Sequence, residues 1–585
     1  MAFPVGRTLF SAVCVGIVVY GVLDFMTNYE QNKCYMTYMF EMPEYLRIPV
    51  FQGKKNPYPK YGLYAYGEGK GNYQGIPVLF IPGNSGSHKQ ARSLGSVAMR
   101  RQMDKRTPFL FNYFTVDFHE ELSGLYGGVL KQQTEFVHFC IKRILKLYTD
   151  FKPTSVILVG HSMGGMIARA LFTLPNFDHS LVNTIITQAT SHQEPVLALD
   201  HYLMEFYNDV NQYWRKYGST KLSHVTVVST GGGLRDLLIR NGLTSLRGTT
   251  AMPHAWVSTD HLCAVWCKQV VLATVRAMFD IVDRKTNQLS LDVNYRMSVF
   301  RHHFLSHTGT RKFVHKWQRK LTLDDSYHWV EQVDGVWEFA EARVMEPRYL
   351  VVPINENSVK DSFVAISNVM SDDWICVCKL NSGEKRCKTC ENLSSKGNVI
   401  PPLDSGRKVL HIRLSDYKAM THIVLIVPKS HDKVEVMGDL YTRSERHLSY
   451  RLPTFSDMLL TYPESVTKGT SVLTLYNDTL YYNLTLLGMD TVLKAFHIQL
   501  QPQKCSSKTD LHDGNMMSLH IPWSNEDVYS FNKLGEVGNL TVKLQNGISQ
   551  EHKDDTIHMR VYIDPACTYL LRIMVSPLQI LGQVS

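Results

Sequence analysis

The sequence predicts an α/β domain with a mostly parallel sheet, followed by an all-β region. Between residue 75 and about residue 290, apolar strand-like runs alternate with helical segments, and parallel strands need such crossovers. From about residue 311, short β-rich runs separated by turn residues are typical of a sandwich or jelly roll. The chain has 585 residues, too many for one core, and its 44% hydrophobic content predicts folded domains rather than disorder.

The N-terminus carries a targeting segment, because an uncharged run from Thr8 to Leu23 follows Arg7. This run is shorter than the roughly 20 residues that span a bilayer comfortably, so a cleaved signal peptide is one interpretation. No small-x-small cleavage site follows, which favours one transmembrane helix, a retained signal anchor over residues 1–26. Both interpretations place the rest of the chain in the lumen of the secretory pathway.

The predicted α/β domain covers residues 27–290. Its strands and helices are expected in strict alternation, which implies a sheet covered on both faces. Its expected strands are 75–82, 112–118, 155–159, 182–188 and 224–229. Its expected helices are 92–101, 128–148, 163–170, 196–217 and 261–282.

A sharp turn after the third of these strands carries a candidate nucleophile. Gly160-His-Ser162-Met-Gly164 fits the G-x-S-x-G elbow, in which a serine occupies a strained turn between a strand and a helix. Glycine is needed on both sides because a Cβ there would crowd the turn. A β-branched apolar strand precedes the motif and small helix-forming residues follow it. This context predicts an α/β-hydrolase sheet with Ser162 as its nucleophile.

The acid and the base of such a site follow the serine in the chain. Asp236 comes after the last expected strand and a Gly-rich loop, and it is the favoured acid; Asp200 is the alternative. His261 lies at the start of the last expected helix and is the favoured base, with His254 as its competitor. The predicted chemistry is acyl transfer to water, as in other Ser-His-Asp hydrolases.

The oxyanion of such a reaction needs two preorganised N–H donors. One is predicted to be the backbone N–H of Met163, the residue after the nucleophile, and the other that of Asn84 in the loop after the first strand. His192 lies on a loop that faces the site, where it is either a substrate contact or structural. Tyr202 and Phe206 lie in an aromatic helical segment that is either a substrate-covering cap or ordinary core.

The remaining chain is divided into a connecting segment over residues 291–345, which carries a β-hairpin, and a β-rich luminal region over residues 346–585. The β-rich region suggests one or two sandwich units and contains no catalytic constellation. Its expected role is scaffolding or substrate presentation.

Cysteines and sequons agree with a secretory location. Eleven cysteines are present, and the cluster Cys376, Cys378, Cys387 and Cys390 suggests disulfides rather than a zinc knot. Cys505 and Cys567 are a plausible further disulfide pair. Cys263 and Cys267 are expected to pack as small apolar side chains. Four N-x-S/T sequons are candidate glycosylation sites: Asn392, Asn477, Asn483 and Asn539. The net charge of +9 is spread without a basic block, so no nucleic-acid surface is expected, and no motif calls for a metal or cofactor.

Five segments together resemble the GPI inositol-deacylase family of endoplasmic-reticulum serine lipases: Cys34–Tyr45, Leu79–Gln90, Val159–Gly165, Ile186–His192 and Trp256–His261. The resemblance covers the N-terminal segment, the α/β domain and the β-rich region. It implies hydrolysis of the fatty acyl ester on the inositol of GPI anchors, which promotes export of GPI-anchored proteins from the endoplasmic reticulum. It also implies a nucleophile at Ser162 and a base at His261.

Members of this family continue into a multi-pass membrane region, and this sequence stops before it, which suggests a shortened form. Two other functions fit the same residues. One is a general luminal phospholipase or transacylase with the same triad. The other is non-catalytic binding of GPI-anchored proteins through the β-rich half.

Overall fold

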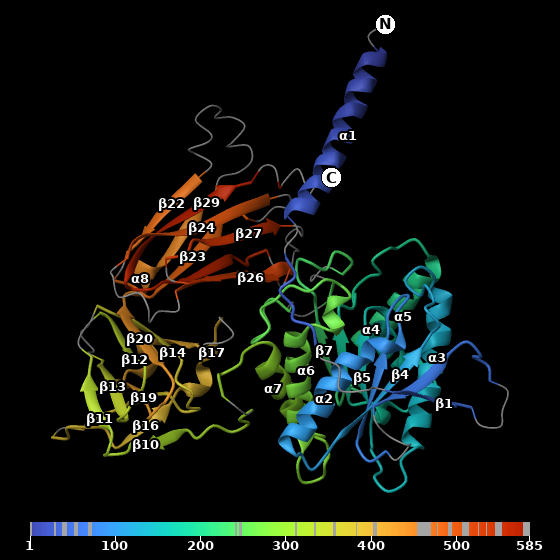
Figure 1. The fold of residues 1–585 in the computed structure, drawn as a ribbon, viewed down its shortest axis with the longest axis horizontal. Helices are drawn as coiled ribbons and strands as arrows, with labels where there is room; N and C mark the ends of the chain where they lie inside the picture. The colour runs from blue at the N-terminus through green and yellow to red at the C-terminus, as the bar shows by residue number, and fades with distance from the viewer. Residues whose placement is uncertain are drawn as a thin grey trace. The chain divides into compact units, whose positions relative to one another are not determined.

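The structure is a computed structural model in which the chain forms two compact units, Glu30–Leu305 and Met1–Tyr29 with Ser306–Ser585 (Figure 1). The residues that the structure describes are 3–28, 31–37, 44–51, 56–67, 73–239, 243–244, 249–310, 313–332, 335–354, 359–381, 383–401, 406–452, 470–476, 478–489, 494–505, 514–524, 526–533, 535–544, 553–576 and 579.

A seven-stranded sheet forms the centre of the first unit, in the order β1-β2-β4-β3-β5-β6-β7. Strands β3 to β7 pair in parallel, and β1 and β2 add an antiparallel edge. Nearly every side chain of β3, β5 and β6 is buried, as expected for a sheet covered on both faces. The strands are β1 Tyr45–Ile48, β2 Gly62–Tyr66, β3 Ile76–Ile81, β4 Phe111–Asp117, β5 Ile157–His161, β6 Thr184–Gln188 and β7 Thr226–Thr230.

Helices cover the two faces of this sheet: α2, α6 and α7 pack together on one face, and α3, α4 and α5 on the other (Figure 1). Their bounds are α2 Arg92–Lys105, α3 Gly127–Leu145, α4 Met163–Ala170, α5 His201–Tyr217, α6 Lys268–Asp280 and α7 Val293–Phe304. The parallel sheet with crossover helices agrees with the predicted α/β-hydrolase class. Short strands β8 Val282–Asp283 and β9 Gln288–Leu289 follow α6.

Two helices differ from their predictions. The last predicted helix was expected from residue 261, but α6 begins at Lys268, because residues 263–265 form a separate 3-10 turn. Helix α7 lies in the predicted connecting segment and was not expected. The side chain of Asp292 starts it by accepting hydrogen bonds from the backbone N–H groups of Asn294 and Tyr295.

The N-terminal segment forms helix α1, Phe3–Asn28. Within the described part of the chain, no helix combines the length and the apolar character that crossing a membrane requires. The signal anchor therefore stays a prediction.

The second unit contains two sandwiches, and the first has a six-stranded sheet β10-β16-β15-β19-β13-β11 and a five-stranded sheet β12-β20-β14-β18-β17. Apolar side chains from both sheets, including the buried Trp374, form its core. Its strands are β10 Lys320–Thr322, β11 His328–Glu331, β12 Val336–Glu341, β13 Arg348–Pro353, β14 Ser362–Ser367, β15 Ile375–Cys378, β16 Thr389–Asn392, β17 Asn398–Val399, β18 Lys408–Arg413, β19 His422–Val427 and β20 Val434–Tyr441.

The predicted hairpin of the connecting segment is wrong. Strand β11 pairs in parallel with β13, whereas β12 pairs antiparallel with β20 in the other sheet. The two runs look like a hairpin in sequence because they are adjacent, but β11 pairs with the next strand but one and β12 with a strand far along the chain. Strands from the predicted connecting segment are therefore part of the first sandwich.

The second sandwich packs a five-stranded sheet, β21-β23-β28-β25-β26, against a four-stranded sheet, β22-β29-β24-β27. Alternate residues of β28 and β29 are buried, which is typical of a sheet with one face on the core. Its elements are α8 Arg443–Arg446, β21 His447–Arg451, β22 Thr470–Leu475, β23 Tyr481–Leu487, β24 Lys494–Cys505, β25 Asn515–Ile521, β26 Glu526–Asn532, β27 Gly538–Leu544, β28 Ile557–Tyr562 and β29 Cys567–Val575.

The cysteines pair as disulfides, with one correction to the prediction. The described disulfides are Cys376–Cys390, Cys378–Cys387, Cys505–Cys567 and Cys34–Cys267. Cys267 was expected to pack as a small apolar side chain, but it meets Cys34, 233 positions away in sequence. Its neighbour Cys263 is buried and free, as predicted.

The predicted sequons differ in their surroundings. Asn392 is buried, and its Nδ2, the atom that would carry a glycan, donates to Gln318 O and Asp373 Oδ1, so this candidate is wrong. Asn539 is exposed and uses only its Oδ1, which accepts from Gln499. Asn483 is half-buried, with its Nδ2 3.3 Å from His447 Nδ1. Asn477 lies outside the described residues.

Candidate active site

Ser162 occupies the turn between β5 and α4 in a strained conformation. Its φ of 53° and ψ of −123° lie in a region that residues with a side chain rarely adopt. The two flanking glycines permit this turn: a Cβ on Gly160 would lie 2.5 Å from Gly165 N, and one on Gly164 would lie 2.1 Å from Ile81 O. The motif therefore holds a serine at the carboxyl end of a central parallel strand, where α/β proteins place their sites.

The loop after β3 lies directly against this serine. A Cβ on Gly83 would lie 2.5 Å from Ser162 Cβ and 3.1 Å from its Oγ. The side chain of Asn84 shapes the loop, because its Oδ1 accepts a hydrogen bond of 2.8 Å from Gly124 N. Among the described residues, the backbone N–H groups of Asn84 and Met163 have no acceptor. Both predicted oxyanion donors therefore have a hydrogen available for a ligand.

His261 and Asp236 form a hydrogen-bonded pair. Nδ1 of His261 lies 3.1 Å from Oδ2 of Asp236, whose side chain is fully buried. The other carboxylate oxygen accepts from the backbone N–H groups of Leu238 and Ile239, at 3.1 and 2.8 Å. Three donors therefore fix the orientation of the carboxylate, so it can hold the proton of the imidazole on Nδ1 and leave Nε2 as a base.

His161, the residue before the nucleophile, ties the histidine loop to the elbow. Its Nε2 donates to the backbone oxygen of His261 at 2.9 Å, and the two rings lie 4.8 Å apart. Burial, and then the charge of His261, lowers the pKa of His161 to about 3. His161 is therefore a neutral donor that holds the His261 loop against the elbow. The sequence analysis missed this role, although His161 lies inside the elbow motif.

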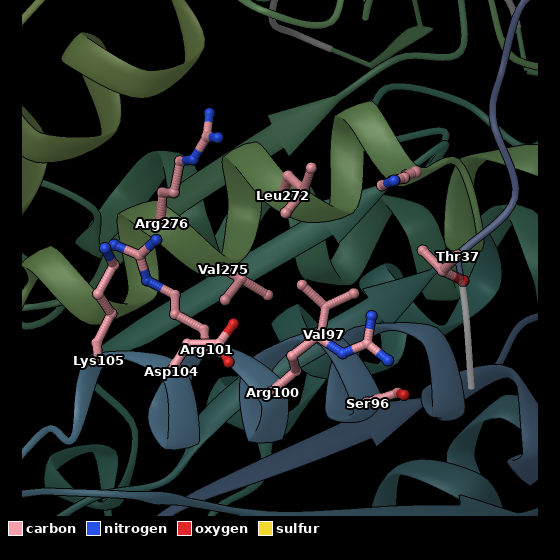
Figure 2. A pocket seen from close by; sticks show the side chains of 11 residues that line it. Thr37, Ser96, Val97, Arg100, Arg101, Asp104, Lys105, Leu272, Val275 and Arg276 are labelled. Atoms are coloured by element: carbon pink, nitrogen blue, oxygen red, sulfur yellow. The ribbon is translucent and has the colours of Figure 1, made fainter. Parts of the chain in front are cut away.

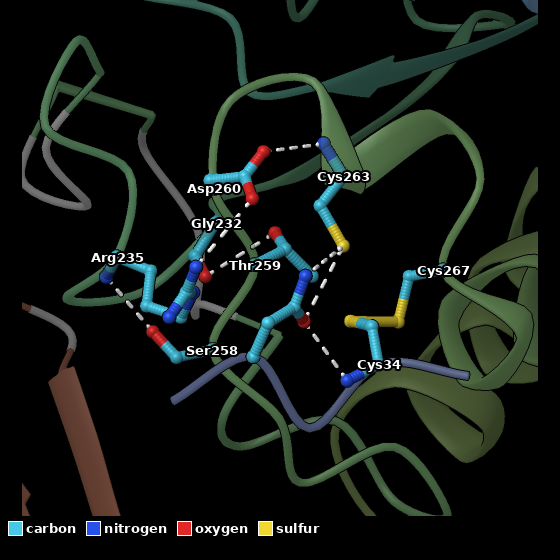
Figure 3. A network of polar contacts seen from close by, with 9 residues as sticks. Cys34, Gly232, Arg235, Ser258, Thr259, Asp260, Cys263 and Cys267 are labelled. Atoms are coloured by element: carbon cyan, nitrogen blue, oxygen red, sulfur yellow. Dashed lines mark hydrogen bonds and ion pairs between the residues drawn. A yellow bond between two sulfur atoms is a disulfide. The ribbon is translucent and has the colours of Figure 1, made fainter. Parts of the chain in front are cut away.

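A second set of contacts joins the acid loop to the histidine loop (Figure 3). The backbone N–H of Arg235 donates to Ser258 Oγ at 2.9 Å, and its guanidinium lies 3.7 Å from Asp260 Oδ2. Thr259 N donates to Gly232 O at 2.6 Å. These bonds fix the segment before Asp236 against the segment before His261. The sequence analysis missed these contacts.

The two alternative residues have other roles. Asp200 accepts hydrogen bonds of 2.8 Å from Leu203 N and Gly127 N, so it caps α5 and ties that helix to the start of α3. His254 lies in a left-handed conformation with its ring 5.7 Å from that of Trp256. Burial lowers the pKa of His254 to about 4. The imidazole that pairs with Asp236 is that of His261.

For two of the candidate substrate and cap residues, the structure favours one of the alternatives left open. His192 is buried, with its ring nitrogens 2.9 Å from Thr187 Oγ1 and 3.2 Å from Arg169 Nη1, so it is structural. Burial and the charge of Arg169 lower its pKa to about 3. Phe206 belongs to the core under α5. Tyr202 on the same helix is 52% exposed and stays a candidate for a surface role.

Two family models match the chain. A PGAP1-like alpha/beta domain matches residues 72–281, which include Ser162, Asp236 and His261, and a GPI inositol-deacylase beta-sandwich domain matches residues 444–585. Among solved structures, esterase B from Lactobacillus rhamnosis covers 47% of this chain and 95% of its own at 14% identity, with a TM-score of 0.26, too low to carry an argument.

Curated relatives match almost the whole chain. GPI inositol-deacylase of Mus musculus is 37% identical over 598 residues, and that of Xenopus laevis 35% over 601 residues; each match covers 98% of this chain and 63% of the relative. The Drosophila melanogaster protein is 27% identical over 94% of this chain and 61% of its own length. The chain thus spans less than two thirds of the length of these relatives. By these matches, the chain belongs to the GPI inositol-deacylase family.

Proposed function

We propose that the chain is a serine esterase that hydrolyses the fatty acyl ester on the inositol of GPI anchors. One observation supports the chemistry: the elbow that holds the strained Ser162 contacts, through His161, the histidine of a hydrogen-bonded Asp236–His261 pair. The substrate rests on the relatives, whose names state that they deacylate GPI inositol. The products are a free fatty acid and a GPI anchor with an unmodified inositol hydroxyl.

The reaction uses Ser162, His261 and Asp236 in their standard order. Ser162 Oγ attacks the ester carbonyl carbon while Nε2 of His261 accepts its proton. His261 then donates that proton to the departing inositol oxygen, which leaves an acyl-serine. A water molecule, deprotonated by His261, attacks the acyl-serine and releases the fatty acid. Asp236 keeps the imidazole in the required tautomer and stabilises its positive form.

The tetrahedral intermediates carry a negative oxygen. The backbone N–H groups of Met163 and Asn84 are the proposed donors, and each is worth roughly 3 kcal/mol of barrier. They lie on the two segments that flank Ser162, and neither has another acceptor among the described residues. Backbone donors cost no reorganisation during the reaction, because the fold holds them in place.

The proposed location is the endoplasmic reticulum, with the bulk of the chain luminal and the N-terminal segment as a membrane anchor. The disulfides of the described residues support an oxidising compartment. The exposed sequon at Asn539 is compatible with it. GPI-anchored proteins and their inositol-acylated lipid are the proposed partners.

The test expresses the chain, Ser162→Ala and a matched control, Ser219→Ala, in cells that lack the deacylase. Ser219 is an exposed serine after α5. Because the inositol acyl group blocks cleavage by a phosphatidylinositol-specific phospholipase C, deacylation is measured as release of GPI-anchored proteins by that enzyme. We expect release with the chain and with Ser219→Ala, and none with Ser162→Ala. Equal release with Ser162→Ala, or no release with the unaltered chain, contradicts the proposal.

A further inference from the structure

A cavity of about 180 Å³ lies between helices α2 and α6 (Figure 2). On each helix, the lining residues recur every three or four positions, so they lie on one face of that helix. Three apolar side chains, Val97, Leu272 and Val275, form part of its wall. None of its lining residues belongs to the site around Ser162. The remaining lining residues are Thr37, Ser96, Arg100, Arg101, Asp104, Lys105, Lys268 and Arg276.

The cavity has a strong excess of positive charge. Five cationic side chains and a single carboxylate, that of Asp104, line it, which leaves a net charge of +4. Figure 2 shows Arg100, Arg101 and Lys105 on α2 and Arg276 on the facing helix α6. So many like charges around one cavity are unfavourable unless an anion neutralises them.

The two half-buried guanidiniums of Arg101 and Arg276 have no counter-ion in the described part of the chain. Neither lies within ion-pair distance of a carboxylate, and the Nε of Arg101 is buried without a hydrogen-bond partner. Burial lowers the pKa of both groups, and the charge of Arg101 lowers that of Arg276 further. The charge of Asp280 raises both pKa values, but its Oδ2 already accepts from His303 at 2.8 Å.

A protein normally pairs charges that it removes from water, because an unpaired buried charge costs several kcal/mol. Here two helices instead place donors around an open cavity. Guanidinium groups present planar pairs of N–H donors that match the oxygens of a phosphate, and a lysine adds a point charge. The apolar wall suits the carbon part of a phosphate ester.

We propose that the cavity between α2 and α6 binds a phosphate-bearing anion through Arg101, Arg276 and Lys105. The ligand is either the headgroup of an anionic phospholipid or a soluble phosphate ester. This site goes beyond the proposed esterase function and does not depend on it, since its residues on α2 and α6 are not those of the site around Ser162.

The test compares the full chain with a double variant, Arg101→Gln with Arg276→Gln, and with a matched control, Lys131→Gln with Lys142→Gln. The control removes the same charge from exposed positions of α3. Inorganic phosphate, titrated against chloride at constant ionic strength, is the first probe, with the melting temperature and calorimetric binding as readouts. Vesicles of phosphatidylinositol in phosphatidylcholine, against phosphatidylcholine alone, are the second probe, scored by flotation.

We expect phosphate to raise the melting temperature of the chain and of the α3 control, and the cavity variant to lose about tenfold or more in affinity. Flotation with phosphatidylinositol vesicles that the cavity variant loses identifies a lipid source; a phosphate response without flotation identifies a soluble ester. Without phosphate, the cavity variant should melt no lower than the chain, because it removes like-charge repulsion. Equal phosphate binding by all three proteins, or a lower melting temperature of the cavity variant in chloride, overturns the proposal.

Discussion

Replacing Asp236 by asparagine tests whether its carboxylate orients the base. The change is isosteric, and Oδ1 of the new side chain can still accept from Leu238 and Ile239 at 3.1 and 2.8 Å. Its amide group would then face His261 Nδ1 in place of the carboxylate oxygen that lies 3.1 Å away. An amide donates, so the imidazole must move its proton to Nε2, where it can no longer accept a proton from Ser162.

The expected loss is large and separable from folding. A wrong histidine tautomer lowers kcat by roughly 10⁴ in a Ser-His-Asp triad, equivalent to about 5 kcal/mol of barrier. Asp236→Asn should keep the melting temperature nearly unchanged because both backbone bonds remain. Asp236→Ala should also lose about 1–3 kcal/mol of stability for each of the two N–H groups that it leaves unpaired.

The assay is hydrolysis of a short-chain chromogenic ester by the purified chain, with melting curves on each variant. Asp200→Asn is the matched control, because it changes the same chemical group at the cap of α5. We expect this control to lose up to about 1 kcal/mol of stability and little activity. An Asp236→Asn enzyme that keeps more than a tenth of the activity, or a larger loss at Asp200, refutes the reasoning.

Three further predictions concern stability. Gly164→Ala should lower the free energy of unfolding by about 1–3 kcal/mol or more and abolish esterase activity, because its Cβ would lie 2.1 Å from Ile81 O. Denaturant unfolding and ester hydrolysis measure these two effects, and a fully active variant contradicts the prediction. Cys34→Ser should lower the free energy of unfolding by about 2–5 kcal/mol, because it removes the Cys34–Cys267 disulfide. Cys263→Ser, which replaces a free thiol, should change the free energy of unfolding less. Equal effects of the two variants would argue against the disulfide. Burial lowers the pKa of folded His192 to about 3, below the ordinary 6.5, so the free energy of unfolding should fall as the pH drops from about 6.5 towards 3. In urea titrations at several pH values, His192→Gln should make this fall shallower. An unchanged dependence of the unfolding free energy on pH contradicts the burial argument.

Much of the α/β unit could be predicted because its signals are local. The apolar runs that became β3, β5 and β6 needed no knowledge of their neighbours, since a strand buried on both faces is apolar throughout. The elbow was equally readable, because its glycines, at positions 160 and 164, are required by contacts within a few residues of Ser162 and by the adjacent strand.

Pairings over long distances in the chain were not readable. Strands β11 and β12 look like a hairpin in sequence, yet each pairs in a different sheet, because the packing of two sheets decides the partner. Cys267 looked like an apolar position, and only the path of the N-terminal segment brings Cys34 to it. Asn392 satisfies the sequon rule, and only the fold shows that its amide is already bonded.

By itself the sequence determined the fold class, the candidate nucleophile and the family, because each depends on residue types within short segments. Only the tertiary structure decided which carboxylate meets which imidazole. Asp200 and Asp236 both follow strands in the sequence, but one caps a helix and the other is buried against His261. A triad is a set of distances between segments that are far apart in the chain, and the packing of helices on the sheet sets those distances.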